Sequence, residues 1–320
     1  IIFNIKMKVL VIQQRYGIGD MVIFLPYLKA ISKKIGGSIT LLAKESSKAK
    51  DLFAEDNFLE EIITLEKSKD GIQGFFRLVK EVKSKKFDKV FIFNGSLRYK
   101  ILSKLAGIKS VYQYPLFISK DVIFETAKKF VEKNLEINVE TQPNIFLKPE
   151  TTKLARDKYN MKENEKHLIL GVSASGPTKR WPINNFIKLA QQLYETYPCR
   201  FYIALGKNDE DLNDKVLNSS IGKHCVSLKN LSIKEMLPII KNSNLYVGND
   251  TGFMHISSAL GVKCLGIFVD SPAYSYSTYS RNINVIVPEG ETLKSTTHDT
   301  LGKDKISFEK VLNFSKKLLV

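Results

Sequence analysis

Three short segments of the chain combine glycine, hydroxyl and charged residues in the way that phosphate-binding and catalytic loops do. The first, residues 15–21, reads Arg-Tyr-Gly-Ile-Gly-Asp-Met, and Gly17 and Gly19 permit a tight turn and a close approach of the backbone to a ligand. Asp20 has two interpretations. It is the N-cap of the helix that follows, because Asp caps helices well, or it is a general base whose carboxylate faces a ligand site.

The second segment, residues 171–182, reads Gly-Val-Ser-Ala-Ser-Gly-Pro-Thr-Lys-Arg-Trp-Pro. Its hydroxyl groups and exposed backbone N–H groups can contact a phosphate, and Lys179 can neutralise the phosphate charge. The alternative is an ordinary loop with a surface lysine, ahead of a helix that Pro182 opens. The spacing does not match a Walker motif.

The third segment, residues 247–261, reads Val-Gly-Asn-Asp-Thr-Gly-Phe-Met-His-Ile-Ser-Ser-Ala-Leu-Gly. We expect a strand to end here, Asp250 or Thr251 to cap a helix of small residues, and Gly252 to leave the backbone uncovered. Free amides at a helix N-terminus bind anions. His255 falls in the first turn of this helix, where a lone histidine is more often a hydrogen-bonded structural residue than a chemical group.

The elements that position these segments follow a βαβ pattern, in which short apolar runs alternate with segments of helical period. A helix is expected around 22–34, and the expected strands are 9–12, 39–42, 90–93, 168–172, 201–205, 245–247 and 264–268. Such alternation predicts parallel sheets with helices on both faces. The polar stretch 128–164 reads as a connection, so we predict two Rossmann-like domains, 1–150 and 151–305, with ligands bound in a cleft at the carboxyl ends of the strands.

The last segment, 306–320, is predicted to be an amphipathic helix. The residues that fall on one helical face are Phe308, Val311, Leu312, Ser315, Leu318 and Leu319. This stripe must pack on one of the two domains.

Composition excludes several classes of protein. The chain has 320 residues, 43% of them hydrophobic and 26% charged, which is ordinary globular composition. No apolar stretch reaches the ~18–20 residues of a membrane-spanning helix, and no signal-peptide cleavage site is evident. The three cysteines are too few for a disulfide framework and lack zinc-site spacing, so we expect a cytoplasmic protein with reduced thiols.

The net charge of +16 is compatible with nucleic acid, an anionic membrane surface or an acidic substrate as partner. The excess is shared almost evenly between the two halves of the chain, and only seven of the 49 basic residues are arginine. An electrostatic footprint for nucleic acid requires clustering. A generic solvated surface is therefore the preferred interpretation, and a nucleic-acid-binding or non-catalytic nucleotide-binding module is the different-class alternative.

The order of the three segments resembles glycosyltransferase family 9, the ADP-heptose:lipopolysaccharide heptosyltransferases. The resemblance extends over essentially the whole chain and rests on Gly-x-Gly-Asp, Lys-Arg-Trp-Pro and Asp-Thr-Gly-x-x-His-x-x-x-Ala-Leu-Gly, with the segment 306–311 similar to the family's final helix. It implies a GT-B fold: two Rossmann-like domains facing across a cleft, with the acceptor on the first, the sugar nucleotide on the second, and the C-terminal helix crossing back to the first.

Site roles follow from the resemblance residue by residue. Asp20 matches the proposed base, with Arg15, Gly17, Gly19 and Arg98 as acceptor-side candidates. The implied donor-binding residues are Ser175, Lys179, Arg180, Glu210, Asp250, Thr251, Gly252 and His255, where Asp209 or Asp211 is an alternative to Glu210 at the ribose.

The implied activity is an inverting, metal-independent transfer of heptose from ADP-heptose to the lipopolysaccharide inner core or a related acceptor. No metal site or cofactor is expected, and the ADP-sugar is a substrate. The within-family alternative is another nucleotide sugar used for a different surface glycan. Lysines on the first domain could also draw the enzyme to a lipid-linked acceptor at the anionic inner membrane face.

Overall fold

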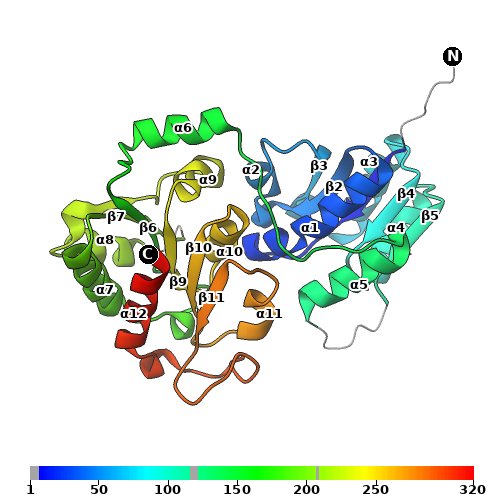
Figure 1. The fold of residues 1–320 in the computed structure, drawn as a ribbon. Coiled ribbons are helices and arrows are strands. Elements are labelled where there is room, and N and C mark those ends of the chain that lie inside the picture. The colour runs from blue at the N-terminus through cyan, green and yellow to red at the C-terminus, as the bar shows by residue number, and fades with distance from the viewer. Residues whose placement is uncertain (1–6, 116–121, 207–208) are drawn as a thin grey trace. The chain divides into compact units, whose positions relative to one another are not determined.

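The computed structural model describes residues 7–115, 122–206 and 209–320. The chain divides into two compact units, Ile1–Pro143 and Asn144–Val320, a few residues before the boundary expected near residue 150. Each unit is built on one parallel sheet flanked by helices (Figure 1). The stretch 128–164, expected to be a connection, contains the end of one helix and the whole of another.

Unit 1 contains a sheet of order β3-β2-β1-β4-β5. Its strands are β1 (Val9–Ile12), β2 (Ile39–Lys44), β3 (Leu59–Leu65), β4 (Lys89–Ile92) and β5 (Ser110–Gln113). Its helices are α1 (Ile18–Ile35), α2 (Ala49–Leu52), α3 (Gly71–Ser84), α4 (Leu97–Leu105) and α5 (Ile123–Leu135), with short 3₁₀ turns at Glu45–Ser47 and Lys67–Lys69.

The two faces of this sheet follow from the alternation of side chains along its strands. Leu10 of β1 and Ile92 of β4 share a core with the buried positions of α3 and α4. The intervening Phe91 and, just after β4, Phe93 point the other way, where both rings meet Phe130 of α5 edge to face. Helices therefore cover both faces, and the carboxyl ends of the strands are left to carry loops.

Unit 2 contains a sheet of order β11-β10-β9-β6-β7-β8. Its strands are β6 (Lys166–Gly171), β7 (Cys199–Ala204), β8 (Cys225–Ser227), β9 (Leu245–Asn249), β10 (Lys263–Ile267) and β11 (Ile283–Ile286). Its helices are α6 (Pro149–Lys158), α7 (Ile183–Thr196), α8 (Glu210–Leu217), α9 (Ile233–Lys241), α10 (Gly252–Ala259), α11 (Ala273–Ser277) and α12 (Phe308–Leu319), with 3₁₀ turns at Pro177–Lys179, Gly222–His224 and Lys303–Lys305.

The strands predicted from apolar runs are all present, within one or two residues at each end. Four strands were not predicted: β3, β5, β8 and β11. They lie at the edges of the two sheets, where most residues of β3 and all of β5 are only partly buried or exposed. Their sequences therefore lack the continuous apolar run that identifies a strand buried on both faces.

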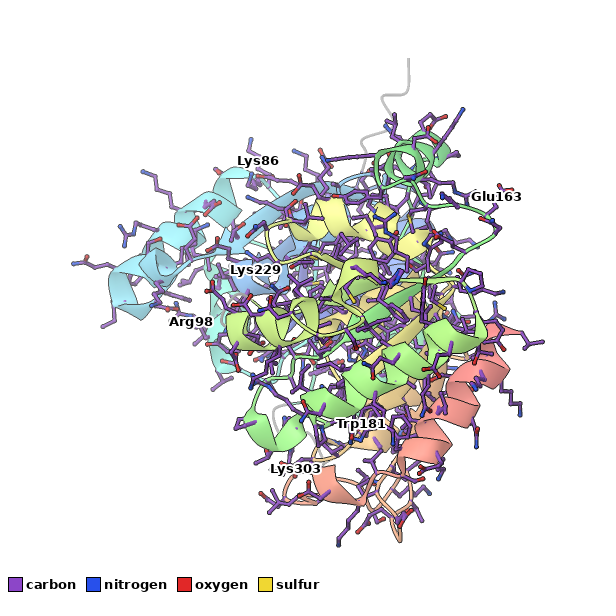
Figure 2. All side chains as sticks on the ribbon, turned by 90° about the vertical axis from the view of Figure 1, so that its left-hand side faces the viewer. Lys86, Arg98, Glu163, Trp181, Lys229 and Lys303 are labelled. Carbon is purple, nitrogen blue, oxygen red and sulfur yellow. The ribbon has the colours of Figure 1, made fainter. Side chains whose placement is uncertain are left out.

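The terminal helix α12 packs within unit 2. Val311 and Leu319 are buried in the same core as Phe186 of α7, and the Phe308 ring stacks on Trp181 with centroids 6.2 Å apart. Figure 2 shows Trp181 among the side chains of this layer. We expected the helix to cross back to the first domain; the structure uses its apolar stripe on its own unit.

Candidate functional site

In unit 2 the strand order reverses direction between β6 and β9, the position at which open parallel sheets bind ligands. Asn249, the last residue of β9, is fully buried there and joins the loops that follow both strands. Its Nδ2 donates to the carbonyl oxygens of Val172 (3.0 Å) and Ser173 (3.3 Å), and its Oδ1 accepts from the backbone N–H of Trp181 at 2.8 Å. Asn249 thereby fixes the first and last parts of the 171–182 loop.

Two facing glycines make room for a buried tyrosine under this junction. Gly171 of β6 and Gly248 of β9 are paired in register, and a Cβ at Gly171 would collide with the Tyr246 hydroxyl. That hydroxyl donates to the Asn249 carbonyl oxygen at 2.8 Å and lies 3.3 Å from Thr251 Oγ1. Burial raises the pKa of Tyr246, so the hydroxyl stays protonated as a donor that supports the Asp250 loop.

The predicted loop 250–252 forms the N-terminus of α10. Thr251 is the N-cap, and its Oγ1 accepts from the backbone N–H of Phe253 at 3.3 Å. Of the two caps considered from the sequence, the structure selects Thr251, so the Asp250 carboxylate is not used as the cap. The amides of this first turn carry the positive end of the helix dipole.

His255 is buried within α10 between two polar partners. Its Nδ1 lies 2.6 Å from the Tyr279 hydroxyl, and its Nε2 lies 3.4 Å from Asp250 Oδ1. Burial raises the pKa of Tyr279, so its hydroxyl stays protonated beside Nδ1, while Nε2 lies on the side of Asp250. His255 is therefore a buried residue with polar partners, and its position behind the loop gives it a means of orienting Asp250.

The predicted anion-binding residues of the 171–182 loop differ in their exposure to solvent and in their partners. Ser175 is exposed and Lys179 is partly exposed at the end of a 3₁₀ turn. Arg180 instead points into an ion pair, with its Nη2 2.5 Å from Asp209 Oδ1. Among the described ion pairs of this loop, Arg180 is engaged with Asp209, so Lys179 is the cation that we consider for a ligand.

The acidic residues after β7 that were considered for contact with a ribose differ in how deeply they are buried. Asp209 is buried and paired with Arg180, whereas the Glu210 side chain is 64% exposed and its Oε1 lies 2.7 Å from the Lys229 Nζ. Asp211 is exposed. Residues 207 and 208, which belong to the same predicted loop, lie outside the described residues.

Asp270, just beyond β10, was not identified from the sequence. Its carboxylate is buried, accepts hydrogen bonds from the Leu301 N–H (3.1 Å), the Asp299 N–H and the Thr178 hydroxyl, and feels the charge of Lys179. Burial alone would raise the pKa of the Asp270 carboxyl. The three hydrogen bonds and the charge of Lys179 outweigh this effect, so the pKa lies below its ordinary value. Asp270 therefore anchors the 3₁₀ turn that carries Lys179. An isolated Asp after a strand gave no signal of this.

In unit 1, Asp20 is not the N-cap. The cap is Gly17, and Asp20 is the third residue of α1, with its Oδ2 accepting from the Gly17 N–H at 3.4 Å. Its Oδ1 accepts from Arg15 Nε at 3.0 Å. The interpretation of Asp20 as the capping residue was therefore wrong by three positions, while the structure brings Arg15, Gly17 and Asp20 together as predicted for one site.

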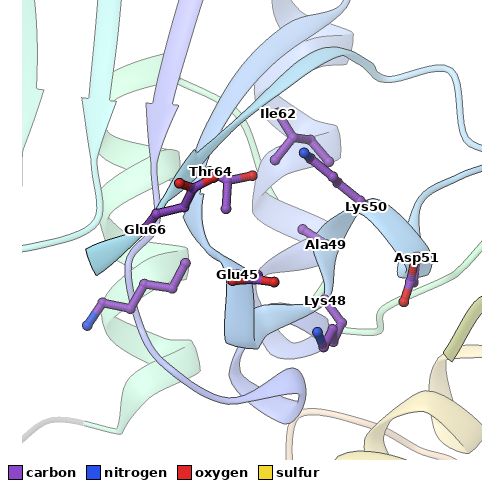
Figure 3. Close-up of a pocket in the computed structure, with 9 residues that line it drawn as sticks. Glu45, Lys48, Ala49, Lys50, Asp51, Ile62, Thr64 and Glu66 are labelled. Atoms are coloured by element: carbon purple, nitrogen blue, oxygen red, sulfur yellow. The ribbon is translucent and has the colours of Figure 1, made fainter. Parts of the chain in front are cut away.

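A cavity of about 560 Å³ opens at the carboxyl ends of the first four strands of unit 1. Arg98 lines it, together with Lys44, Lys69 and Tyr16, while Asp20 is not among its lining residues. A second cavity of about 220 Å³ lies next to it, beside the start of α2 (Figure 3). The two cavities have three lining residues in common: Lys44, Glu45 and Glu66. Polar and charged side chains of both signs predominate in the lining, which suits a hydroxyl-rich ligand.

The model of glycosyltransferase family 9 (heptosyltransferase) matches residues 75–304. The chain belongs to this family. A similar curated protein is lipooligosaccharide heptosyltransferase 2 of Haemophilus influenzae, 27% identical over 227 residues that span 66% of this chain and 62% of that protein. The heptosyltransferase of the same name from Campylobacter jejuni serotype O:6 is 26% identical over 78% of both chains.

Solved structures give the fold. This chain is similar to E. coli ADP-heptose lipopolysaccharide heptosyltransferase II, with a TM-score of 0.78 at 18% identity over 98% of both chains. It is also similar to the family 9 glycosyltransferase of Veillonella parvula, with a TM-score of 0.80 at 17% identity over 98% of this chain and 97% of that one. The predicted GT-B class with two Rossmann-like sheets is confirmed.

The described residues contain neither a membrane-spanning helix nor a cluster of metal-binding side chains. Within 7–115, 122–206 and 209–320, no helix is long and apolar enough to cross a membrane. The same part of the chain holds no group of three or more His, Cys, Asp or Glu side chains placed to bind a metal ion.

Proposed function

We propose that this protein is an inverting, metal-independent glycosyltransferase that moves heptose from ADP-heptose to the lipopolysaccharide inner core or a related acceptor. Family membership and the heptosyltransferase names of its relatives support the reaction class. The observation that carries the proposal is the junction at Asn249, which joins a lysine-bearing loop to the amide-rich N-terminus of α10. Such a junction suits a nucleoside diphosphate.

In this proposal unit 2 binds the donor. The ammonium of Lys179, the Ser175 hydroxyl and the first amides of α10 hold the diphosphate, with Thr251 and Gly252 forming the turn. Asp250, oriented by His255, accepts hydrogen bonds from hydroxyls of the sugar. Glu210 or a neighbouring acid contacts the ribose, and Arg180 stiffens this region through Asp209.

Unit 1 binds the acceptor and supplies the base. The Asp20 carboxylate, held by the Gly17 N–H and by Arg15, takes the proton of the acceptor hydroxyl. The acceptor oxygen then attacks the anomeric carbon of the heptose from the face opposite the diphosphate. A new C–O bond forms as the bond to the diphosphate oxygen breaks, so the configuration inverts and ADP leaves. Arg98 and the cavity it lines contact the rest of the acceptor.

Charge that develops on the leaving diphosphate must be stabilised as the bond breaks. Lys179 and the α10 amides are fixed before the reaction by Asp270 and Asn249, so they need not reorganise during it. Activity that survives EDTA is therefore expected. Loss of activity in EDTA, restored by a divalent cation, would contradict the metal-independent part of the proposal.

We place the enzyme in the cytoplasm, peripheral to the inner membrane face. Cys199, Cys225 and Cys264 are free, and two of them are buried, which suits a reducing compartment. The net charge of +16 favours contact with anionic lipid.

The experiment that tests the donor assignment is a thermal-shift panel of nucleotides and nucleotide sugars. A ligand at 100 times its Kd adds about 2.7 kcal/mol to the free energy of unfolding. ADP and ADP-heptose should raise the Tm at lower concentration than UDP, GDP or their sugars. Stabilisation by a different nucleotide sugar would instead support the within-family alternative, and binding of duplex DNA without any nucleotide response would overturn the enzyme assignment.

A further inference from the structure

Helices α3 and α4 of unit 1 each carry an apolar stripe on the side away from their buried positions. The exposed fractions are 79% for Ile72 and 58% for Phe76 on α3, and 55% for Leu97, 47% for Ile101 and 48% for Leu105 on α4. Residues four apart lie on one helical face, so each stripe is continuous. Scattered exposed apolar residues are ordinary, but a contiguous set indicates an interaction surface.

The two stripes belong to one surface because the starts of the helices are tied together. The Arg98 guanidinium of α4 lies 5.0 Å above the Phe75 ring of α3, and its Nη2 donates to the Lys69 carbonyl oxygen at 2.9 Å. The Phe75 ring in turn meets the Phe76 ring edge to face, with centroids 5.6 Å apart. Figure 2 shows Arg98 at this position on unit 1. The apolar side chains therefore flank the seam between α3 and α4.

Positive charge surrounds this apolar seam. The two helices carry six basic residues and one acidic residue; the basic residues are Arg77, Lys80, Lys83, Arg98, Lys100 and Lys104. The single acid, Glu81, has its Oε2 2.9 Å from the Lys69 Nζ and is neutralised. On the outer face, Lys80, Lys83, Lys100 and Lys104 are exposed beside the apolar side chains.

We infer that the α3–α4 face, defined by Ile72, Phe76, Leu97, Ile101 and Leu105 with the lysines beside them, docks on an anionic phospholipid bilayer. Apolar side chains that enter the headgroup region, ringed by lysines that reach lipid phosphates, are the combination by which a surface helix holds to such a membrane. A protein partner with an acidic rim could also pair with these lysines. However, the face offers only apolar and basic side chains, with no feature that would recognise the shape of a particular protein. This inference refines the peripheral contact proposed above and does not depend on sugar transfer, because its test contains neither donor nor acceptor.

The test is co-sedimentation of the full chain with vesicles of phosphatidylethanolamine and phosphatidylglycerol, compared with vesicles of neutral phosphatidylcholine. We expect binding to the anionic vesicles that weakens with salt, and little binding to the neutral ones. The triple substitution Phe76→Ser, Leu97→Ser, Ile101→Ser and the charge reversal Lys100→Glu, Lys104→Glu should each weaken binding, the latter on the order of 10²-fold.

Matched controls come from unit 2. Leu154→Ser on α6 removes a side chain that is as exposed as those of the seam, and Lys153→Glu with Lys234→Glu reverses two exposed lysines elsewhere. Both controls should bind vesicles within about threefold of wild type. Equal loss in the charge control would show that only total charge matters and would overturn the assignment to this face.

A direct readout uses the single tryptophan. Trp181 is buried, so Phe76→Trp adds the one exposed indole. Its fluorescence should shift to the blue and be quenched by brominated acyl chains in anionic vesicles, whereas Leu154→Trp should show neither effect. Absence of quenching at Phe76→Trp, wild-type binding by the triple variant, or a lipid-free dimer that the triple variant dissociates would each overturn the inference.

Discussion

The side-chain oxygen of Asn249 accepts a hydrogen bond from the backbone N–H of Trp181 across the reversal point of the second sheet, at 2.8 Å. Because Asn249 ends one strand and Trp181 closes the loop after its neighbour, this bond sets the distance between the loop with Lys179 and the helix that begins at Gly252. The donor site that we propose is thus held together by a buried side-chain amide, and the positions of Lys179 and the α10 amides depend on it.

Asn249→Ala should therefore destabilise unit 2 and loosen the donor site together. The change strands the buried Trp181 N–H and removes the donor to two carbonyl oxygens, at a cost of about 2–4 kcal/mol. A fall in Tm of roughly 5–10 °C is expected by calorimetry, with weaker ADP binding by titration. Asn284→Ala, which loses one partly buried hydrogen bond, should lower the Tm less. Equal Tm values for the two variants would contradict the role given to Asn249.

Lys179→Ala should weaken ADP binding by about 10- to 100-fold without affecting folding. A charge-assisted contact to phosphate contributes on the order of 1.5–3 kcal/mol, and Lys179 is partly exposed, so its removal leaves no buried group without a partner. Isothermal titration with ADP measures the effect. Lys223→Ala, at an exposed site of the same unit, serves as the control. Unchanged ADP affinity would remove Lys179 from the site.

Asp270→Asn should reveal a pH-dependent contribution to stability. The folded-state pKa of Asp270 lies below its ordinary value of 3.8, so the carboxylate stabilises the fold above the pKa of the unfolded chain, and this stabilisation is lost as pH falls through the lower, folded-state value. The difference in unfolding free energy between wild type and variant should be largest near neutral pH and shrink below about pH 4.

Denaturant unfolding measured between pH 3 and pH 7 tests this prediction, with Asp304→Asn as an exposed carboxylate control. A difference between wild type and Asp270→Asn that stays constant over this range would show that the charge of Asp270 is not what the three hydrogen bonds recognise. Since Asp270 anchors the turn of Lys179, the variant should also bind ADP more weakly at pH 7.

The sequence allowed the prediction of those parts of the fold that are buried on both faces. The runs 168–172 and 245–247 are continuously apolar because helices cover both sides of the strands they form. The edge strand β3, Leu59–Leu65, places Glu60 and Glu61 before Ile62 and Ile63 and fully buries only one of its seven residues, so its pairing is decided by the neighbouring strand. The packing of α12 could not be predicted, because an amphipathic stripe does not identify its partner.

Site residues also fall into two groups, those that a local sequence pattern reveals and those that only the folded structure reveals. Lys179, Thr251 and Gly252 carry local signals, since a lysine in a small-residue loop and a capped helix start are visible in the sequence alone. Other site residues act through contacts that no sequence spacing reveals. Asn249 and Asp270 form hydrogen bonds with residues more than 20 positions away, and Tyr246 acts through its buried neighbour Asn249. Asp20 was placed at the correct helix but at the wrong position in it, because Gly17 takes the cap.

We propose that Asp20 deprotonates the acceptor for heptose transfer, and the substitution Asp20→Asn tests this role most directly. Asn keeps the size of the side chain and an oxygen that can accept from Arg15 and from the Gly17 N–H, and it loses the basicity. The measurement is the rate of ADP release and of heptosylated product formation, by mass spectrometry, from ADP-heptose and a heptose-deficient lipopolysaccharide core. We predict wild-type melting, wild-type ADP affinity and a turnover that is about 10²- to 10⁴-fold lower. Transfer by Asp20→Asn at close to the wild-type rate would contradict the account.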